Sequence, residues 1–216
     1  MNSWEQVVSS HWFRLGLKIG AGALAVALLG LGAWLWQSRQ ESRGQLALAE
    51  AGQLVLQVET AQGSPEARER AINALQGVIE RYPRLGLVPQ AAYQLGNLRY
   101  AGGQYGAARG AYEVAIGKGA TGSMRTLAAL GIGYTWEAEK NYANAATAYE
   151  SALKGLEPKS VLAEEGLLAL ARVQELGGKP AAALDTYRRV LKDMPESSRG
   201  EELRIRIASL QSRAKQ

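Results

Sequence analysis

The segment LGNLRYAGGQYGAARGAYEVAI, residues 95–116, decides the fold because the chain repeats it. Residues 132–153 read IGYTWEAEKNYANAATAYESAL, in which the shared glycine, alanine and tyrosine positions recur 37 residues later. A third copy places its tyrosine at Tyr187, and a degenerate earlier copy ends at Tyr82-Pro83. Self-similarity at a fixed period of about 20–50 residues is typical of proteins built from stacked repeat units.

Each unit reads as two helices joined by a short turn. We expect close helix crossings at the small residues of the first two copies: Gly96, Ala108, Ala115, Gly133, Ala145 and Ala152. Large side chains are expected to fill the gaps between layers: Tyr112, Tyr149 and Tyr187. Residues that suit helix ends stand in the turns and after the second helices: Gly103, Lys140-Asn141, Gly177-Gly178, Pro83, Pro158 and Pro195. One hairpin cannot bury its apolar face alone, so the units must stack, and the sequence predicts an all-α fold.

These residues resemble the tetratricopeptide repeat family. Its unit has a Leu-Gly in the first helix, a Gly-x-Tyr turn, an alanine and an aromatic residue in the second helix, and a closing proline. The copy at residues 89–118 matches best and the copy at 126–158 matches well, whereas the copy at 161–195 has Pro180 for the turn tyrosine and Ala171 for the glycine. The earliest copy, residues 45–83, matches only in its second half. The resemblance implies an α-solenoid of about three to four helical hairpins.

The C-terminal segment is expected to close the array with one more helix. Ser197 or Ser198 can cap this helix, and Leu203, Ile207 and Leu210 form a single apolar stripe along it. A helix that is apolar on one face and charged elsewhere is the solvent-facing cap that repeat arrays need.

A second pattern lies near the N-terminus, where residues 15–36 read LGLKIGAGALAVALLGLGAWLW with one charge, at Lys18. About 20 apolar helical residues span a bilayer core, and Trp34 and Trp36 close the segment as interfacial aromatic residues do. The sequence therefore predicts a single transmembrane helix ahead of the repeats. The expected organisation begins with an N-terminal tail (residues 1–14) and the transmembrane helix (15–36). A juxtamembrane helix with the degenerate first repeat (37–85), the tetratricopeptide-like repeats (86–195), and a capping helix with a tail (196–216) follow.

A cleaved signal peptide is the alternative for the apolar segment. The segment is long for the apolar region of a signal peptide and it ends in bulky tryptophans, which favours an uncleaved anchor. Basic residues flank both ends, so the positive-inside rule gives little preference, but the short N-terminal tail favours translocation of the large domain. We therefore expect a single-pass protein of the bacterial inner (cytoplasmic) membrane, in contact with the lipid bilayer, with its C-terminal domain in the periplasm.

One face of the expected transmembrane helix carries small residues, which let two helices approach closely in lipid. They recur at spacings of four, three, four and three residues: Gly16, Gly20, Ala23, Ala27 and Gly30. We expect this face to pack against another helix. The alternative is that glycine and alanine are simply common in membrane spans.

The composition excludes several classes of site. The chain has no cysteine, and its single histidine, His11, lies ahead of the repeats, which excludes thiol chemistry and histidine-based catalysis from the repeats. The net charge of +5 is mild and interspersed, without the basic stripe of a nucleic-acid binder. No glycine-rich loop ends in Gly-Lys-Ser/Thr, and adjacent carboxylates such as Glu164 and Glu165 point apart on a helix. We expect no enzyme activity, cofactor, metal, nucleic acid or small-molecule substrate.

The binding of proteins is the function class that remains. The resemblance implies that the first helices of the units line a concave groove that takes peptides or partner segments. The groove positions of the family fall on nine residues: Tyr93, Asn97, Tyr100, Leu130, Tyr134, Glu137, Leu168, Arg172 and Glu175. Tyrosine offers rigid contact area, asparagine can bond a peptide backbone, and Arg172 can meet a carboxylate. The alternative is that the tyrosines serve only as packing between layers.

The order of segments also resembles the YfgM-type family of bacterial inner-membrane proteins, which are ancillary to the Sec translocon and work beside a periplasmic chaperone. The segment from Tyr82 to Gly96 also resembles the corresponding segment of envelope proteins of the YbgF/CpoB and BamD type. Proteins of those types differ at the N-terminus, where they carry a cleaved signal or a lipoprotein cysteine. The leading hypothesis is a non-enzymatic, membrane-anchored scaffold that recruits or holds protein partners through the groove and the transmembrane helix. The alternative is a stoichiometric accessory subunit of a larger respiratory or photosynthetic membrane complex.

Overall fold

The structure is a computed structural model that describes the backbone of residues 11–60 and 64–213, and the side chains in these ranges except at 11–17, 19–21, 59, 60 and 213. The chain divides into two compact units, residues 1–46 and 47–216. The described residues form helices joined by short turns: α2 (His11–Thr60), α3 (Pro65–Arg81), α4 (Val88–Ala101), α5 (Tyr105–Gly117), α6 (Gly122–Ala138), α7 (Tyr142–Leu153), α8 (Val161–Leu176), α9 (Pro180–Asp193) and α10 (Gly200–Arg213). The all-α prediction is confirmed for these residues.

The apolar segment near the N-terminus departs from its predicted role. Among the residues whose side chains are described, no helix has an apolar stretch long enough to cross a bilayer. Residues 15–17 and 19–21 lie outside the described side chains. The lack of a membrane-spanning helix among the described residues overturns the prediction of a transmembrane helix over residues 15–36. It also overturns the predicted single-pass location in the bacterial inner membrane with a periplasmic domain.

The face of small residues on α2 is described only in part. Ala23 and Ala27 are exposed, and a Cβ added at Gly30 would meet no atom within 4 Å. Gly16 and Gly20 lie outside the described side chains. The packing of another helix against this face therefore stays a prediction.

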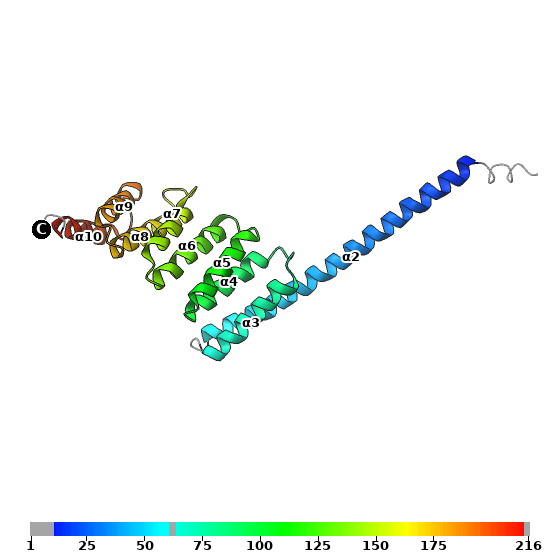
Figure 1. The fold of residues 1–216 in the computed structure, drawn as a ribbon, viewed down its shortest axis with the longest axis horizontal. Helices are drawn as coiled ribbons and strands as arrows, with labels where there is room; N and C mark the ends of the chain where they lie inside the picture. The colour runs from blue at the N-terminus through cyan, green and yellow to red at the C-terminus, as the bar shows by residue number, and fades with distance from the viewer. Residues whose placement is uncertain (1–10, 61–63, 214–216) are drawn as a thin grey trace, which may run out of the picture. The chain divides into compact units, whose positions relative to one another are not determined.

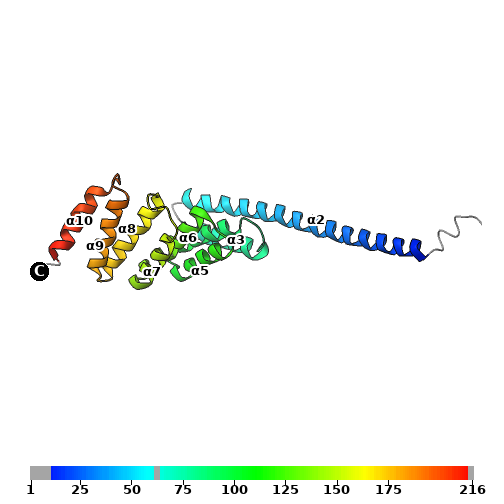
Figure 2. The ribbon, with the colours of Figure 1, turned by 90° about the horizontal axis from the view of Figure 1, so that it is seen from above.

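From Ala47 onward, consecutive helices pair into hairpins that follow one another in chain order, α4 with α5, α6 with α7 and α8 with α9 (Figures 1 and 2). Each helix from α3 to α10 packs against the next, and the first helices of neighbouring repeats, α4 with α6 and α6 with α8, are also in contact. The buried apolar residues form successive clusters along this row, each shared by neighbouring helices. At its end, α10 buries Leu203 and Leu210 in a cluster with Tyr187 and Val190, as the predicted apolar stripe requires.

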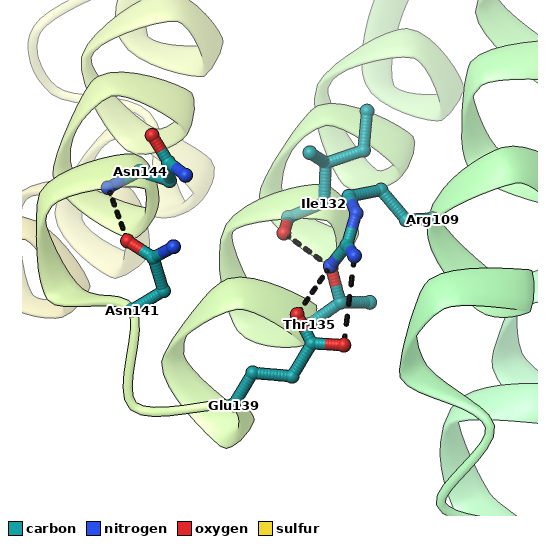
Figure 3. A network of polar contacts seen from close by, with 6 residues as sticks. All are labelled: Arg109, Ile132, Thr135, Glu139, Asn141 and Asn144. Carbon is teal, nitrogen blue, oxygen red and sulfur yellow. Dashed lines mark hydrogen bonds and ion pairs between the residues drawn. The ribbon is translucent and has the colours of Figure 1, made fainter.

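Polar side chains start several helices. Ser64 Oγ accepts a hydrogen bond from the Ala67 N–H at 3.3 Å, with Pro65 in the first turn of α3. Asn141 Oδ1 accepts one from the Asn144 N–H at 3.2 Å at the start of α7 (Figure 3). These contacts satisfy backbone donors that have no partner within the helix.

The tyrosines of the second helices pack where the first helices have no side chain. Tyr112 on α5 is only 3% exposed, and its ring lies against Gly96 of α4 and Gly131 of α6. A Cβ added at Gly96 would lie 2.5 Å from the ring, and one at Gly131 would lie 2.7 Å from it. Tyr149 on α7 is fully buried and packs in the same way on Gly133, where an added Cβ would overlap its ring. The expected close approach of small residues and interlayer tyrosines is thus confirmed at Gly96 and Gly133.

A second link between repeats runs through Arg109 on α5 (Figure 3). Its Nη1 donates to Thr135 Oγ1 and to Glu139 Oε2, both at 3.0 Å, and its guanidinium carbon lies 3.4 Å from the Trp136 ring centroid. Thr135 is fully buried and donates in turn to the Ile132 carbonyl at 2.7 Å. Charge-assisted hydrogen bonds and a stacked ring together fix α5 against the C-terminal half of α6.

The fit of tyrosine on glycine predicts opposite effects for two glycine-to-alanine substitutions. Gly133→Ala forces a methyl group into the Tyr149 ring, and we expect it to lower the free energy of unfolding by about 1–3 kcal/mol. Gly110→Ala, in the exposed interior of α5 with no atom within 4 Å of the added Cβ, should raise it by about 0.5–1 kcal/mol. Thermal unfolding followed by circular dichroism measures both variants. Equal effects of the two substitutions would contradict the packing described here.

Candidate functional site

A cleft of about 510 Å³ opens where α4, α6 and α8 follow one another. It is lined by these three first helices, by the turn after α6 and by the start of α7: Tyr100, Tyr134, Glu137, Ala138, Lys140, Tyr142, Arg172 and Leu176. We name it the Tyr100–Arg172 cleft. Its volume falls within the range of about 300–1,000 Å³ that is common for ligand-binding clefts.

The structure brings four of the nine predicted groove residues together in this cleft: Tyr100, Tyr134, Glu137 and Arg172. Tyr100 is 36% exposed and presents apolar ring surface at the mouth of the cleft. Arg172 keeps 47% of its side chain exposed. The cleft therefore exposes an aromatic ring and part of a guanidinium group.

The other five predicted residues lie elsewhere. Leu130 and Leu168 are 1% and 8% exposed and belong to the clusters between helices. Tyr93 is half-buried, with its ring centroid 5.9 Å from that of the buried tyrosine of α5. Asn97 accepts a hydrogen bond at 2.8 Å from the hydroxyl of the same tyrosine, and Glu175 is bound by an arginine of α10. The ring contact of Tyr93 agrees with the alternative of packing between layers, and a partner-binding role for these five positions stays a prediction.

Glu137 is the centre of the polar contacts in the cleft. Arg172 donates to it through Nε at 2.6 Å and through Nη2 at 2.9 Å, in the two-pronged geometry that guanidinium and carboxylate groups favour. The hydroxyl of Tyr149 donates to Glu137 Oε2 at 2.8 Å. One carboxylate on α6 thus holds a residue of α7 and a residue of α8, and so joins two repeats at the floor of the cleft.

The next repeat carries a matching contact. Arg206 of α10 donates to Glu175 of α8 through Nε at 2.9 Å and through Nη2 at 2.5 Å. Tyr134, on the wall of the cleft, donates its hydroxyl to Glu165 Oε1 at 2.5 Å. Contacts between charged and polar groups of successive first helices therefore continue along this face of the stack.

Burial changes the acidity of the tyrosines around the cleft. Burial, followed by hydrogen bonding to a carboxylate, raises the pKa of Tyr149 and of Tyr134 far above the usual value for tyrosine. Burial also raises the pKa of Tyr112 and of Tyr100. The hydrogen bond to Glu137 raises the pKa of Arg172, which favours the charged form of this arginine. The tyrosine hydroxyls are therefore neutral donors near neutral pH.

The first helices of the three repeats end in the same turn, which sets the rim of the cleft. In each, a backbone N–H donates to the carbonyl five residues earlier at 2.8–2.9 Å: Gln104 to Arg99, Asn141 to Trp136 and Lys179 to Gln174. The residue before each donor has a positive φ: 73° at Gly103, 58° at Lys140 and 73° at Gly178. This left-handed residue is the usual way for a helix to end, and it confirms the predicted turn residues.

Lys140 differs from its two counterparts because it is not glycine. An L-residue in the left-handed region costs about 1–2 kcal/mol, whereas glycine adopts it freely. The Lys140 side chain lines the cleft, and no carboxylate among the described residues forms an ion pair with it. The chain therefore retains a strained, unpaired cation at the rim of the cleft. Backbone strain of this kind points to a function of the side chain.

Sequence reasoning missed half of the cleft. Ala138, Lys140, Tyr142 and Leu176 line it but were not among the predicted groove residues. Lys140 and Tyr142 flank the turn between the two helices of one repeat, and the turn lies beside the cleft only because α8 of the next repeat packs across it. The one signal available in the sequence was a lysine at a repeat position that holds glycine in the neighbouring copies.

The described residues offer little for catalysis by metals. Among them, no group of three histidine, cysteine, aspartate or glutamate side chains is placed to hold a metal ion. The cleft instead combines three tyrosines, two apolar side chains, at Ala138 and Leu176, and three charged groups. Such surfaces are suited to the recognition of another polypeptide.

Comparisons with known proteins agree with the repeat architecture. A family model described as a tetratricopeptide repeat matches residues 165–197, which cover most of α8 and all of α9. No curated protein matches the chain. The crystal structure of BtubC (BKLC) from P. vanneervenii is similar in fold, with a TM-score of 0.59 and 14% sequence identity over 82% of this chain and 84% of that chain.

These findings support a tetratricopeptide-repeat protein, built as a stack of helical hairpins. A domain of this type is typically an interaction module without enzymatic activity, and it binds protein partners. The finer resemblance to the YfgM-type family, with its N-terminal anchor, is not confirmed by these comparisons.

The raised pKa values of the buried tyrosines predict a loss of stability in alkali. Tyrosine in the unfolded chain ionises near pH 10, whereas the folded protein holds Tyr112, Tyr134 and Tyr149 neutral to higher pH. The unfolded state therefore releases protons first, and stability that is fully present below about pH 10 is lost as the pH rises above it.

Tyr149→Phe tests this effect at one hydroxyl. At pH 8 we expect the variant to be less stable than the natural chain by about 1–2 kcal/mol, because Glu137 loses a donor. Between about pH 9 and pH 11 the variant should lose less stability than the natural chain, since one ionisable group has been removed. Urea unfolding of both proteins at pH 8, 9 and 11 measures both quantities. Parallel losses in the two proteins would show that Tyr149 does not contribute to the alkaline transition.

Proposed function

We propose that the Tyr100–Arg172 cleft binds a polypeptide segment of a protein partner, and that the chain acts as a protein-interaction scaffold. Tetratricopeptide repeats suggest such a scaffold, and stacked repeats commonly use the surface of their first helices for binding. The observation that carries the proposal is Lys140, whose strained backbone keeps a cation at the rim of the cleft where the equivalent positions are glycine.

The chemistry of the lining residues supports a peptide ligand. Tyrosine and arginine are the side chains that most often dominate the energy of protein interfaces, and Tyr100 and Arg172 both keep exposed surface in the cleft. Leu176, 53% exposed, offers an apolar contact beside them. An extended segment with one apolar side chain and polar backbone groups would find matching surfaces here.

Two more specific predictions required a membrane-spanning helix. Attachment beside the Sec translocon and membership of a respiratory or photosynthetic membrane complex both depended on the helix predicted over residues 15–36. Neither version is supported by the described helices. The proposal is therefore limited to the partner-binding role of the repeats.

Site-specific photo-crosslinking tests the proposal. A photoreactive amino acid placed at Leu176 in the full-length chain should give a discrete crosslinked partner in the native cell extract, whereas one placed at Val161 should not. Val161 is 82% exposed and lies outside the cleft. Adding Tyr100→Ala should reduce the crosslinked product by at least about fivefold, in line with the loss of an aromatic anchor.

Val114→Ala provides the matched control for that experiment. Val114 is 37% exposed, close to the 36% of Tyr100, but it lies on α5 away from the cleft. If Tyr100→Ala and Val114→Ala both fold and give the same amount of crosslinked product, the cleft does not bind the partner.

Lys140→Gly separates stability from binding. Because glycine relieves the left-handed backbone, we expect the variant to be more stable than the natural chain by up to about 1 kcal/mol. The same variant should show weaker crosslinking from Leu176, since the cation at the rim is lost. A more stable variant with unchanged crosslinking would mean that Lys140 has no role in binding.

A further inference from the structure

A second cavity lies toward the opposite end of α6 from the Tyr100–Arg172 cleft. It has a volume of about 270 Å³ and is formed by the end of α5, residues 125–132 of α6, and the end and C-cap of α7: Ile116, Arg125, Thr126, Ala129, Ile132, Ala148, Ser151, Ala152 and Lys154. We name it the Arg125–Lys154 groove. It shares no lining residue with the Tyr100–Arg172 cleft, so the two can be tested separately.

The floor of the groove is mostly apolar, with Thr126 as its buried polar residue, and its rim is polar. Ile116 and Ile132 are partly buried and contribute the largest apolar side chains of the lining. Ser151 is exposed at the rim. The volume lies just below the range of about 300–1,000 Å³ that holds small-molecule ligands, and it suits one or two side chains of a partner.

The charge of the groove is entirely positive. Its lining contains two cations, Arg125 from α6 and Lys154 at the C-cap of α7, and no carboxylate. Neither cation takes part in an ion pair with any residue that the structure describes. Like Lys140, these two cations are therefore available to a ligand, whereas Arg109, Arg172 and Arg206 are held by carboxylates.

The fold gives a reason for one of the two cations but not for the other. Lys154 follows the C-terminus of α7, where the helix dipole favours positive charge. Arg125 is the fourth residue of α6, near its N-terminus, where the dipole disfavours positive charge, and the first turn of α6 has no acidic residue to offset it. The helix dipole therefore disfavours a cation at Arg125, and no ion pair among the described residues offsets this effect.

We propose that the Arg125–Lys154 groove binds an acidic segment of a protein partner, in which a carboxylate residue stands beside an apolar one. The apolar side chain packs on Ile116 and Ile132, and the carboxylates form charge-assisted hydrogen bonds with Arg125 and Lys154. A single anionic side chain would leave the apolar floor uncovered, and an apolar residue alone would leave both cations unpaired. The groove is a second binding surface, which does not depend on the Tyr100–Arg172 cleft.

Methyl-group NMR of the full-length chain tests the proposal with a defined probe. The probe is the peptide acetyl-Gly-Asp-Leu-Glu-Gly-amide, and its neutral counterpart is acetyl-Gly-Asn-Leu-Gln-Gly-amide. The acidic peptide should shift the methyl resonances of Ile116 and Ile132 in a saturable way and leave that of Ile205, exposed on α10, unchanged. Raising the salt concentration should weaken the effect, because the rim charges are exposed.

Arg125→Gln and Lys154→Gln should each weaken binding of the acidic peptide by at least about fivefold. Lys118→Gln is the matched control, because Lys118 is also a C-cap lysine, of α5, but does not line the groove. We expect that variant to bind like the natural chain.

Three results would overturn the proposal. They are equal shifts with the neutral peptide, binding that neither Arg125→Gln nor Lys154→Gln weakens in a folded protein, and saturation of the same resonances by inorganic phosphate without an effect of the peptide. The last result would assign the groove to a small anion. Unchanged crosslinking from the cleft in Arg125→Gln would show that the two surfaces are independent.

Discussion

The structure depends on the contact between a tyrosine ring and a helix that lacks a side chain at the same level. Tyr112 lies between Gly96 of its own repeat and Gly131 of the next, and Tyr149 lies on Gly133. A ring in van der Waals contact with two backbones sets the distance between consecutive first helices. Because protein interiors are closely packed, a single added methyl group at any of these glycines changes that distance or displaces the ring.

The same tyrosines link the interior of the stack to its binding surface. Their rings are buried between helices, while their hydroxyls reach the first helices, where Tyr112 donates to Asn97 and Tyr149 donates to Glu137. Glu137 also holds Arg172 across the boundary between repeats. The residues that position the Tyr100–Arg172 cleft are therefore tied to the residues that keep the hairpins together. A ligand that contacts Arg172 meets a side chain already fixed in direction, which lowers the entropy lost on binding.

Some cations of the chain form ion pairs between repeats, whereas others are exposed and unpaired within the described residues. Arg109, Arg172 and Arg206 each bind a carboxylate of a neighbouring repeat and so contribute to stacking. Lys140 and Arg125 behave differently, since both occupy positions that the local backbone disfavours and neither is paired within the described residues. Local strain or unfavourable charge at otherwise regular elements is expected where function competes with stability. The two proposed binding surfaces rest on this contrast.

Much of the fold was accessible from the sequence, because the repeat places glycine and tyrosine at matching positions and the turn residues mark the helix ends. The location of Leu130 and Leu168 in the interior was not accessible, since family groove positions do not determine how far each helix is rotated. The pairing of Glu137 with Arg172 joins residues in different repeats and depends on how the repeats stack. The transmembrane prediction relied on hydropathy over residues 15–36, and no helix of the described residues is long and apolar enough to span a membrane. The sequence marks Lys140 only as a turn residue where the neighbouring copies have glycine, and it does not mark Arg125 at all.

A double-mutant cycle on Tyr112 and Gly131 tests the central claim, that a ring packed on glycine fixes the spacing of the first helices. Gly131→Ala should lower the free energy of unfolding by about 1–3 kcal/mol when Tyr112 is present. In the background of Tyr112→Leu, which removes the ring, the same substitution should cost much less, giving a coupling energy of about 1 kcal/mol or more. Effects of the two substitutions that add to within about 0.5 kcal/mol would contradict the claim.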